Sequence, residues 1–204
     1  MTPAMSPRPP LAGLRVIESS LLEPGAITTH LADLVAAVIK VESPGGDYIR
    51  EMTWPIVEGV SLLHLHVHRG KQSIVLDLRK PEAVAVYLDL VRGADVVVEA
   101  MRPGSLAKRG LGFEELRAVN PKIVFCNISG YGMTGPYKDL PAHGIAFDTW
   151  AGILNVARDD EGFTYIPEHA SMGMHAGPLF GALGILAAVL RARETGAGSQ
   201  LEIG

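Results

Sequence analysis

The sequence has a single cysteine, Cys126, among its 204 residues. One thiol cannot form an internal disulfide, so we expect a protein of a reducing compartment, the cytoplasm. Cys126 stands in the apolar run IVFCNIS, where a cysteine ordinarily serves as a small buried side chain.

The chain also lacks an excess of basic residues and a long uninterrupted apolar run. Its formal net charge is −4 and its pI is near 6.0, so charge gives no reason to expect nucleic acid or an anionic membrane as a partner. The longest apolar stretch, near 178–190, is interrupted by Pro178 and several glycines, and it is shorter than the roughly 20 residues of a membrane span. We expect a core helix there. Residues 1–10 lack the apolar centre of a signal peptide and are expected to form a flexible arm.

Strand-like and helix-like segments alternate along the rest of the chain, residues 11–204, which we expect to form one domain. The expected strands are 14–19, 37–43, 73–78, 94–100 and 122–129, and the expected helices are 25–37, 80–94 and 113–120. Strands that alternate with helices at this spacing predict an α/β fold, with a Rossmann-like, doubly wound and mostly parallel sheet.

Four glycine-rich, proline-rich or basic segments lie at or near predicted strand ends: 44–50, 68–73, 101–110 and 130–139. Ligands of doubly wound sheets bind beyond the carboxyl ends of the strands. Glycines let backbone amides approach an anion, and lysine and arginine supply charge for phosphates. The segments therefore favour a phosphate-bearing ligand, although solvated turns remain the alternative. No G-x-G-x-x-G follows the first strand and no P-loop motif is present, so a standard dinucleotide or P-loop site is not indicated.

Five segments, in this order, carry a resemblance to a known family: LAGLRVIES, HLADLVAAVIKVESPGGDYIR, HRGKQSIVLDLRKPE, ADVVVEAMRPGSLAKRGLGFEELRAVNPKIVFCNISGYGMTGPYKD and GILAAVLRARETGAGSQLEI. Over about residues 11–203 the chain resembles the class III CoA-transferases, a family that includes α-methylacyl-CoA racemase and carnitine CoA-transferase. The resemblance implies a Rossmann-like large domain, CoA thioesters as substrates, no permanently bound cofactor and no metal.

The resemblance also implies which residues bind coenzyme A. The HRGK and LDL segments match the family's stretch along the CoA nucleotide, and MRPGSLAKRG matches the loop against its diphosphate and adenine. The implied CoA-binding residues are Arg69, Lys71, Leu76, Met101, Arg102 and Lys108. The chain departs from the family at three positions. Ser43 stands where many members have an arginine that contacts CoA, His68 replaces an asparagine, and Val35 replaces a glycine.

The resemblance places the chemistry in the segment before the last helix. Racemase members move the α-proton of an acyl-CoA with a His/Asp pair, whereas transferase members use the Asp as a nucleophile. The family's histidine matches His143. The family's aspartate aligns either with His169 or near Met174, beside His175, and none of these is an aspartate. Glu168 is the only carboxylate close by in the sequence.

A histidine can still move a proton, because its ordinary pKa is near 6.5. We therefore predict that His143 faces the Glu168–His175 segment across the acyl-binding cleft. His169 would be the partner base, and Glu168 would orient one imidazole. The alternative is that these side chains lie on the first turns of a helix without a catalytic role. The negative charge of Glu168 would then interact favourably with the positive end of the helix dipole.

Three functions remain open from the sequence. The first is an enzyme or enzyme subunit that acts on acyl-CoA, by CoA transfer or by α-proton chemistry. The second is a non-catalytic CoA-binding partner of another subunit, because the expected Asp is absent. The third is a nucleotide-binding regulatory domain. Family members are about twice this long and form interlocked dimers, so the resemblance implies a homo- or hetero-oligomer, with a homologous subunit or a separately encoded second half.

Overall fold

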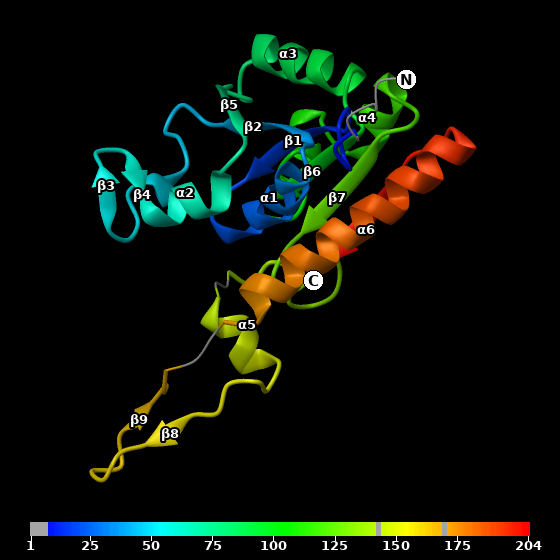
Figure 1. Cartoon of the computed structure of the whole chain (residues 1–204). Coiled ribbons are helices and arrows are strands. Elements are labelled where there is room, and N and C mark those ends of the chain that lie inside the picture. Colours follow the sequence, from blue (N-terminus) through cyan, green and yellow to red (C-terminus); the bar gives the residue numbers. More distant parts are fainter. Residues whose placement is uncertain (1–7, 142–143, 169–170) are drawn as a thin grey trace, which may run out of the picture.

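A parallel β-sheet of six strands forms the centre of the molecule, shown here by a computed structural model that describes residues 8–141, 144–168 and 171–204. The strands are β1 (Arg15–Ser20), β2 (Ala37–Glu42), β5 (Gln72–Val75), β6 (Val96–Ala100), β7 (Val124–Ile128) and β10 (Ser199–Ile203). Their order is β5-β2-β1-β6-β7-β10, so the chain winds outward from β1 in both directions (Figure 1). The predicted doubly wound fold is confirmed.

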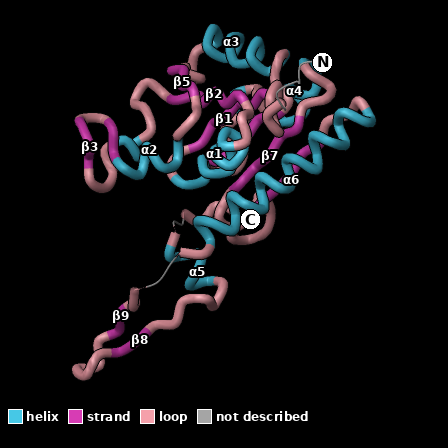
Figure 2. Tube along the Cα trace, viewed as in Figure 1, coloured by secondary structure: helices cyan, strands magenta, loops and turns pink. Residues whose placement is uncertain are grey.

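Helices cover both faces of this sheet (Figure 2). The helices of one face are α1 (Ala26–Asp33) and α6 (Gly173–Thr195), and those of the other are α3 (Pro81–Arg92) and α4 (Phe113–Val119). Side chains alternate along β1, so Val16 joins the core under α1 and α6 while Ile17 joins the core under α3 and α4. All five residues of β6 are buried, as expected for a central parallel strand.

Helix α6 is longer than the apolar run that predicted it. It spans 23 residues and begins five residues before Pro178, which it contains near its start. By length and composition it could cross a membrane, so the expectation that this run is too short is wrong. One such helix is weak evidence for a span, and core helices pass the same test. Ile185, Ala188 and Val189 of α6 are buried in the core of the sheet, which confirms its role as a core helix.

The predicted helix 25–37 is shorter in the structure, where α1 ends at Asp33. Val35 then takes a left-handed conformation, with φ of 71°, and the chain turns directly into β2. Glycine reaches this conformation without strain, but a β-branched side chain does not. A glycine, as the resemblance implies at this position, would therefore relieve strain in the backbone.

Short elements escaped the sequence analysis. These are β3 (Pro55–Val57), β4 (Val60–Ser61), α2 (Leu62–His68), α5 (Ile145–Trp150), β8 (Ala157–Arg158), β9 (Thr164–Tyr165) and the edge strand β10 of the central sheet, with 3-10 turns at Glu23–Gly25, Tyr48–Arg50 and Ala107–Arg109. The hairpin β8–β9 extends away from the sheet beyond α5 (Figure 1). The strand expected at 73–78 is β5, which ends at Val75.

Candidate functional site

The carboxyl ends of the parallel strands lie along one edge of the sheet, and the strand order reverses there between β1 and β6. Chain connections leave in opposite directions at such a point, which opens a crevice for ligands in doubly wound sheets. Residues 21–25 follow β1 at this crevice, and residues 101–106 follow β6. The basic loop 101–110 therefore flanks the position where a ligand is expected.

A buried carboxylate fixes the shape of this basic loop. Glu99 of β6 is only 2% exposed, and its Oε1 accepts the backbone N–H of Leu106 at 2.7 Å. Its Oε2 accepts the side-chain amide of Asn127 at 2.8 Å. Burial raises the pKa of Glu99. The anchored loop leaves Arg102 and Lys108 exposed, as a phosphate-binding role requires.

Two apolar members of the predicted CoA set lie at the same edge. Met101 comes directly after β6, and Leu76 comes directly after β5. Both are partly buried and pack against the core under α3 and α4. The structure thus places Leu76, Met101, Arg102 and Lys108 at the carboxyl edge, with apolar and cationic groups that suit a nucleotide.

The other two predicted CoA residues are already engaged within the protein. The side chain of Lys71 is 2% exposed, and its Nζ lies 2.8 Å from Glu18 Oε2 and donates to the carbonyl of Gly25 at 2.7 Å. Burial lowers the pKa of Lys71 to about 8, against the opposing effect of Glu18. The exposed Arg69 forms an ion pair with Asp33 of α1. Contact of either cation with CoA stays a prediction, and it would require these pairs to open.

Lys71 belongs to a buried charge network beneath the crevice. Lys40 Nζ lies 3.1 Å from Glu18 Oε1 and 3.0 Å from Asp47 Oδ2, and His68 Nε2 lies 3.3 Å from the same Asp47 oxygen. Burial would raise the pKa of Glu18, but Lys71, Lys40 and His68 outweigh it and lower that pKa to about 2. Breaking a buried ion pair costs about 3–5 kcal/mol. The network therefore ties the ends of β1 and β2 to α2 and the segment before β5.

The predicted acid–base residues are only partly visible. His143 and His169 lie outside the described residues, so their pairing stays a prediction. Glu168 is exposed, and His175 is exposed in the first turn of α6. Within the described residues, no group of three or more His, Cys, Asp or Glu side chains is arranged to hold a metal ion.

Asp148 is the carboxylate that the sequence analysis missed. It lies in α5 and is 2% exposed, yet its Oδ1 accepts the backbone N–H of Gly173 at 2.8 Å and its Oδ2 accepts the hydroxyl of Ser171 at 2.8 Å. Glu168 is the carboxylate close by in the sequence, and the fold brings Asp148 to this segment as a second one. Asp148 is more than twenty residues away in sequence, and folding of α5 against the start of α6 brings it there. In the sequence, the only sign of a special role is that Asp148 is the fourth residue of IAFDTW, a segment that is otherwise mostly apolar.

The joint between α5 and α6 is closely packed. Gly144 precedes α5 with a φ of 30°, and a Cβ there would lie 3.0 Å from Sδ of Met174. The resemblance places the family's aspartate either at His169 or near Met174, and this alignment stays a prediction. Asp148 therefore brings a carboxylate to the segment where that aspartate is missing.

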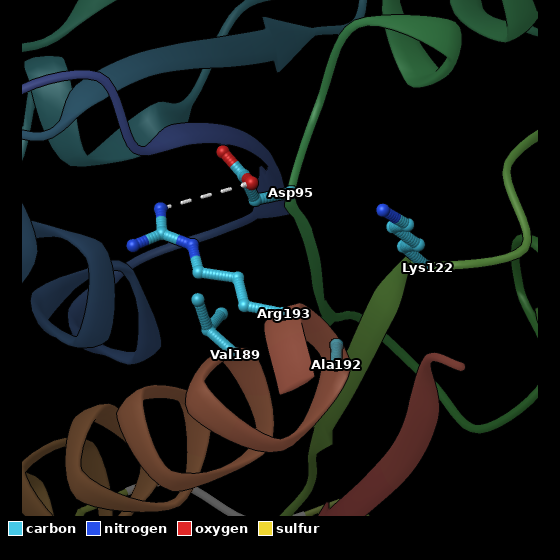
Figure 3. Close-up of a pocket in the computed structure, with 5 residues that line it drawn as sticks. All are labelled: Asp95, Lys122, Val189, Ala192 and Arg193. Atoms are coloured by element: carbon cyan, nitrogen blue, oxygen red, sulfur yellow. Dashed lines mark ion pairs between the residues drawn. The ribbon is translucent and has the colours of Figure 1, made fainter. Parts of the chain in front are cut away.

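A small pocket at the opposite edge of the sheet does not belong to this site. Figure 3 shows it between the amino ends of β6 and β7 and the last turns of α6, where Arg193 pairs with Asp95 at 4.0 Å. Its volume is about 30 Å³, about tenfold below the smallest usual small-molecule sites. Exposed Lys122 lies on its rim and carries a charge far from the carboxyl edge.

Known proteins with similar sequences are named as CoA-transferases. The chain is 38% identical to a succinate–glutarate CoA-transferase of Agrobacterium fabrum, over 100% of this chain and 52% of the relative. It is 35% identical to the beta subunit of a succinyl-CoA–L-malate CoA-transferase of Chloroflexus aurantiacus, over 95% of this chain and 48% of the relative. The chain thus spans about half the length of these relatives.

A solved structure and a family model agree with these relatives. The crystal structure of a CaiB/BaiF family protein from Brucella suis superposes with a TM-score of 0.85 and 33% identity, over 97% of this chain and 53% of that one. The model of CoA-transferase family III matches residues 11–204, which include the basic loop, the buried network and the α5–α6 joint. The chain therefore belongs to CoA-transferase family III.

Proposed function

We propose that this chain provides the CoA-binding part of a class III CoA-transferase, which moves CoA between carboxylic acids. The observation that carries the proposal is the anchored basic loop at the switch point. Glu99 fixes its backbone, and Arg102 and Lys108 remain exposed beside the crevice. Their charges suit the phosphates of CoA, and Leu76 and Met101 offer apolar surface to its adenine.

Completion of the site by further protein is part of this proposal. The relatives are about twice as long, and one of them is named as the beta subunit of a CoA-transferase. We infer that a second half or a homologous subunit supplies the rest of the cleft. The carboxylate chemistry of the transfer would then involve the segment from α5 to the first turn of α6, where Asp148 is buried.

Calorimetric titration with CoA and with 3′-dephospho-CoA tests the binding step. We expect CoA to bind, and Arg102→Ala or Lys108→Ala to weaken it about fivefold each, because each change removes one charge-assisted phosphate contact. Lys122→Ala is the matched control, since it removes another exposed lysine, which lies at the opposite edge of the sheet. Failure of the folded chain to bind CoA at millimolar concentration would refute the proposal.

Transfer itself is tested with the chain and its second half or partner together. An acyl-CoA and a free carboxylate acceptor are incubated with them, and mass spectrometry follows the appearance of CoA on the acceptor. If CoA binds but no acceptor is converted to its CoA thioester with any of the acyl-CoA donors offered, the chain is a binding subunit and not a transferase.

A further inference from the structure

Four aromatic rings gather where the chain leaves β7 and enters α5. The ring centroids of Tyr137 and Trp150 lie 4.9 Å apart, and Tyr131 lies 5.7 Å from Trp150 and 5.8 Å from Phe147, all edge to face. Gly130 makes room for the cluster, because a Cβ there would lie 1.9 Å from a ring carbon of Phe147. The backbone and the rings are therefore fitted to each other.

The outer part of this cluster is open. Trp150 is 60% exposed and Tyr137 is 46% exposed, so a further flat group can extend the edge-to-face packing. The loop that carries Tyr131 and Tyr137 follows the carboxyl end of β7, which is the edge where parallel sheets bind ligands. Through α5 the cluster adjoins Asp148 and the start of α6.

The same region offers little to a negatively charged acyl group. Between the end of β7 and the first turn of α6, lysine and arginine occur at two positions. Lys138 is paired with Asp139 at 2.8 Å, and Arg158 lies in β8, on the hairpin that extends away from the sheet (Figure 1). Asp148 is buried beside the cluster. Among the described residues of this region, a second carboxylate on the substrate would therefore find few lysine or arginine partners.

The relatives are named for succinate, glutarate and L-malate, which are all dicarboxylates. We propose that this chain instead takes an uncharged, flat apolar acyl group, such as an aryl group, against Tyr137 and Trp150. The inference rests on the proposed function, since the acyl group reaches the cluster as part of a CoA thioester. It names the substrate class that the α5 region selects.

Competitive calorimetry on the full chain with CoA, benzoyl-CoA and succinyl-CoA tests this inference. Benzoyl-CoA should bind about fivefold more tightly than CoA, as expected for one added aromatic contact, and succinyl-CoA should bind no more tightly than CoA. Trp150→Ala and, separately, Tyr137→Ala should remove the benzoyl advantage and leave the affinity for CoA unchanged. Unchanged CoA affinity also shows that each variant is folded.

The control is Trp54→Ala, which removes an 80% exposed tryptophan just before β3 and should preserve the benzoyl advantage. The inference is overturned if succinyl-CoA binds as tightly as benzoyl-CoA, or if both cluster variants still bind benzoyl-CoA more tightly than CoA. In either case, binding of CoA itself would still support the proposed function. If none of the three ligands binds, the proposed function fails and the inference fails with it.

Discussion

Val35 is a single residue whose β-branched side chain strains its own backbone conformation. Its φ of 71° lies in the left-handed region, and its side chain is 54% exposed, so no burial offsets the strain. Val35→Gly should raise the free energy of unfolding by about 0.5–1 kcal/mol, because relief of a left-handed β-branched residue exceeds the entropy cost of glycine. Urea denaturation measures this. Val86→Gly, at an exposed position within α3, should have the opposite sign.

The buried charge network makes stability depend on pH in two ranges. Glu18 has a folded pKa of about 2 against an ordinary value of 4.5, so its contribution is complete above pH 4.5 and is lost as pH falls toward 2. Lys71 has a folded pKa of about 8 against 10.5, so the unfolded chain binds more protons between these values. Its effect is therefore a gain in stability as pH rises from 8 to 10.5.

Urea midpoints measured from pH 2.5 to 10.5 test both signs. Lys71→Met should remove the gain in stability above pH 8 but keep a loss of stability at acid pH. Glu18→Gln should reduce the loss of stability at acid pH. An alkaline range that is identical in Lys71→Met and the parent chain would show that Lys71 ionises normally in the folded protein.

At the scale of elements, Asp148 joins α5 to α6. Asp148→Asn keeps the shape of the side chain but weakens the bonds from Ser171 and Gly173, which a charged acceptor strengthens. We expect a loss of about 1–2 kcal/mol and faster hydrogen exchange at the amide of Gly173. Asp160→Asn, an exposed substitution on the β8–β9 turn, should change neither quantity. Unaltered protection of Gly173 would mean that its amide does not depend on Asp148.

The large elements were predictable because their patterns are local. The β-branched run around Val96 and the spacing of Val84, Leu88 and Val91 in α3 specify strand and helix without distant contacts. The hairpins β3–β4 and β8–β9 have strands of two or three residues, too short to show a period. Helix α6 runs through Pro178 because its packing against the sheet outweighs one missing backbone bond.

The site was predictable where a motif and a strand end coincide, as in loop 101–110. It was not predictable where side chains pair across the fold. Lys71 looks like a free cation in the sequence, but Glu18 from β1 occupies it in the structure. Asp148 looks like a residue of an isolated short helix, and only the packing of α5 on α6 gives it partners.

At the scale of the whole molecule, α6 presents an apolar face to solvent. Leu179, Leu183 and Leu190 are 58%, 62% and 68% exposed, and a groove between α1 and α6 runs beside the first two. Exposed apolar area of this kind drives association, so we expect the chain to self-associate when no partner is present. Light scattering at increasing concentration measures this, and Leu183→Glu should shift the chain toward monomer. A monodisperse parent chain at high concentration would contradict the expectation.

The strand order has a consequence for how the chain folds as it is made. Strand β1 can pair with β2 as soon as both have been made. Its other neighbour, β6, is made later, and there Val16 pairs with Val96. Strand β7 gains its outer neighbour only when β10 is made, where Val124 pairs with Ser199. At about 5–20 residues per second, the ribosome leaves β7 without its outer neighbour and without the cover of α6 for several seconds. Over that interval Val96, Val98 and Val124, which pack under α1 and α6 in the folded chain, face water or a chaperone, so the yield of native protein depends on how fast residues 173–203 emerge.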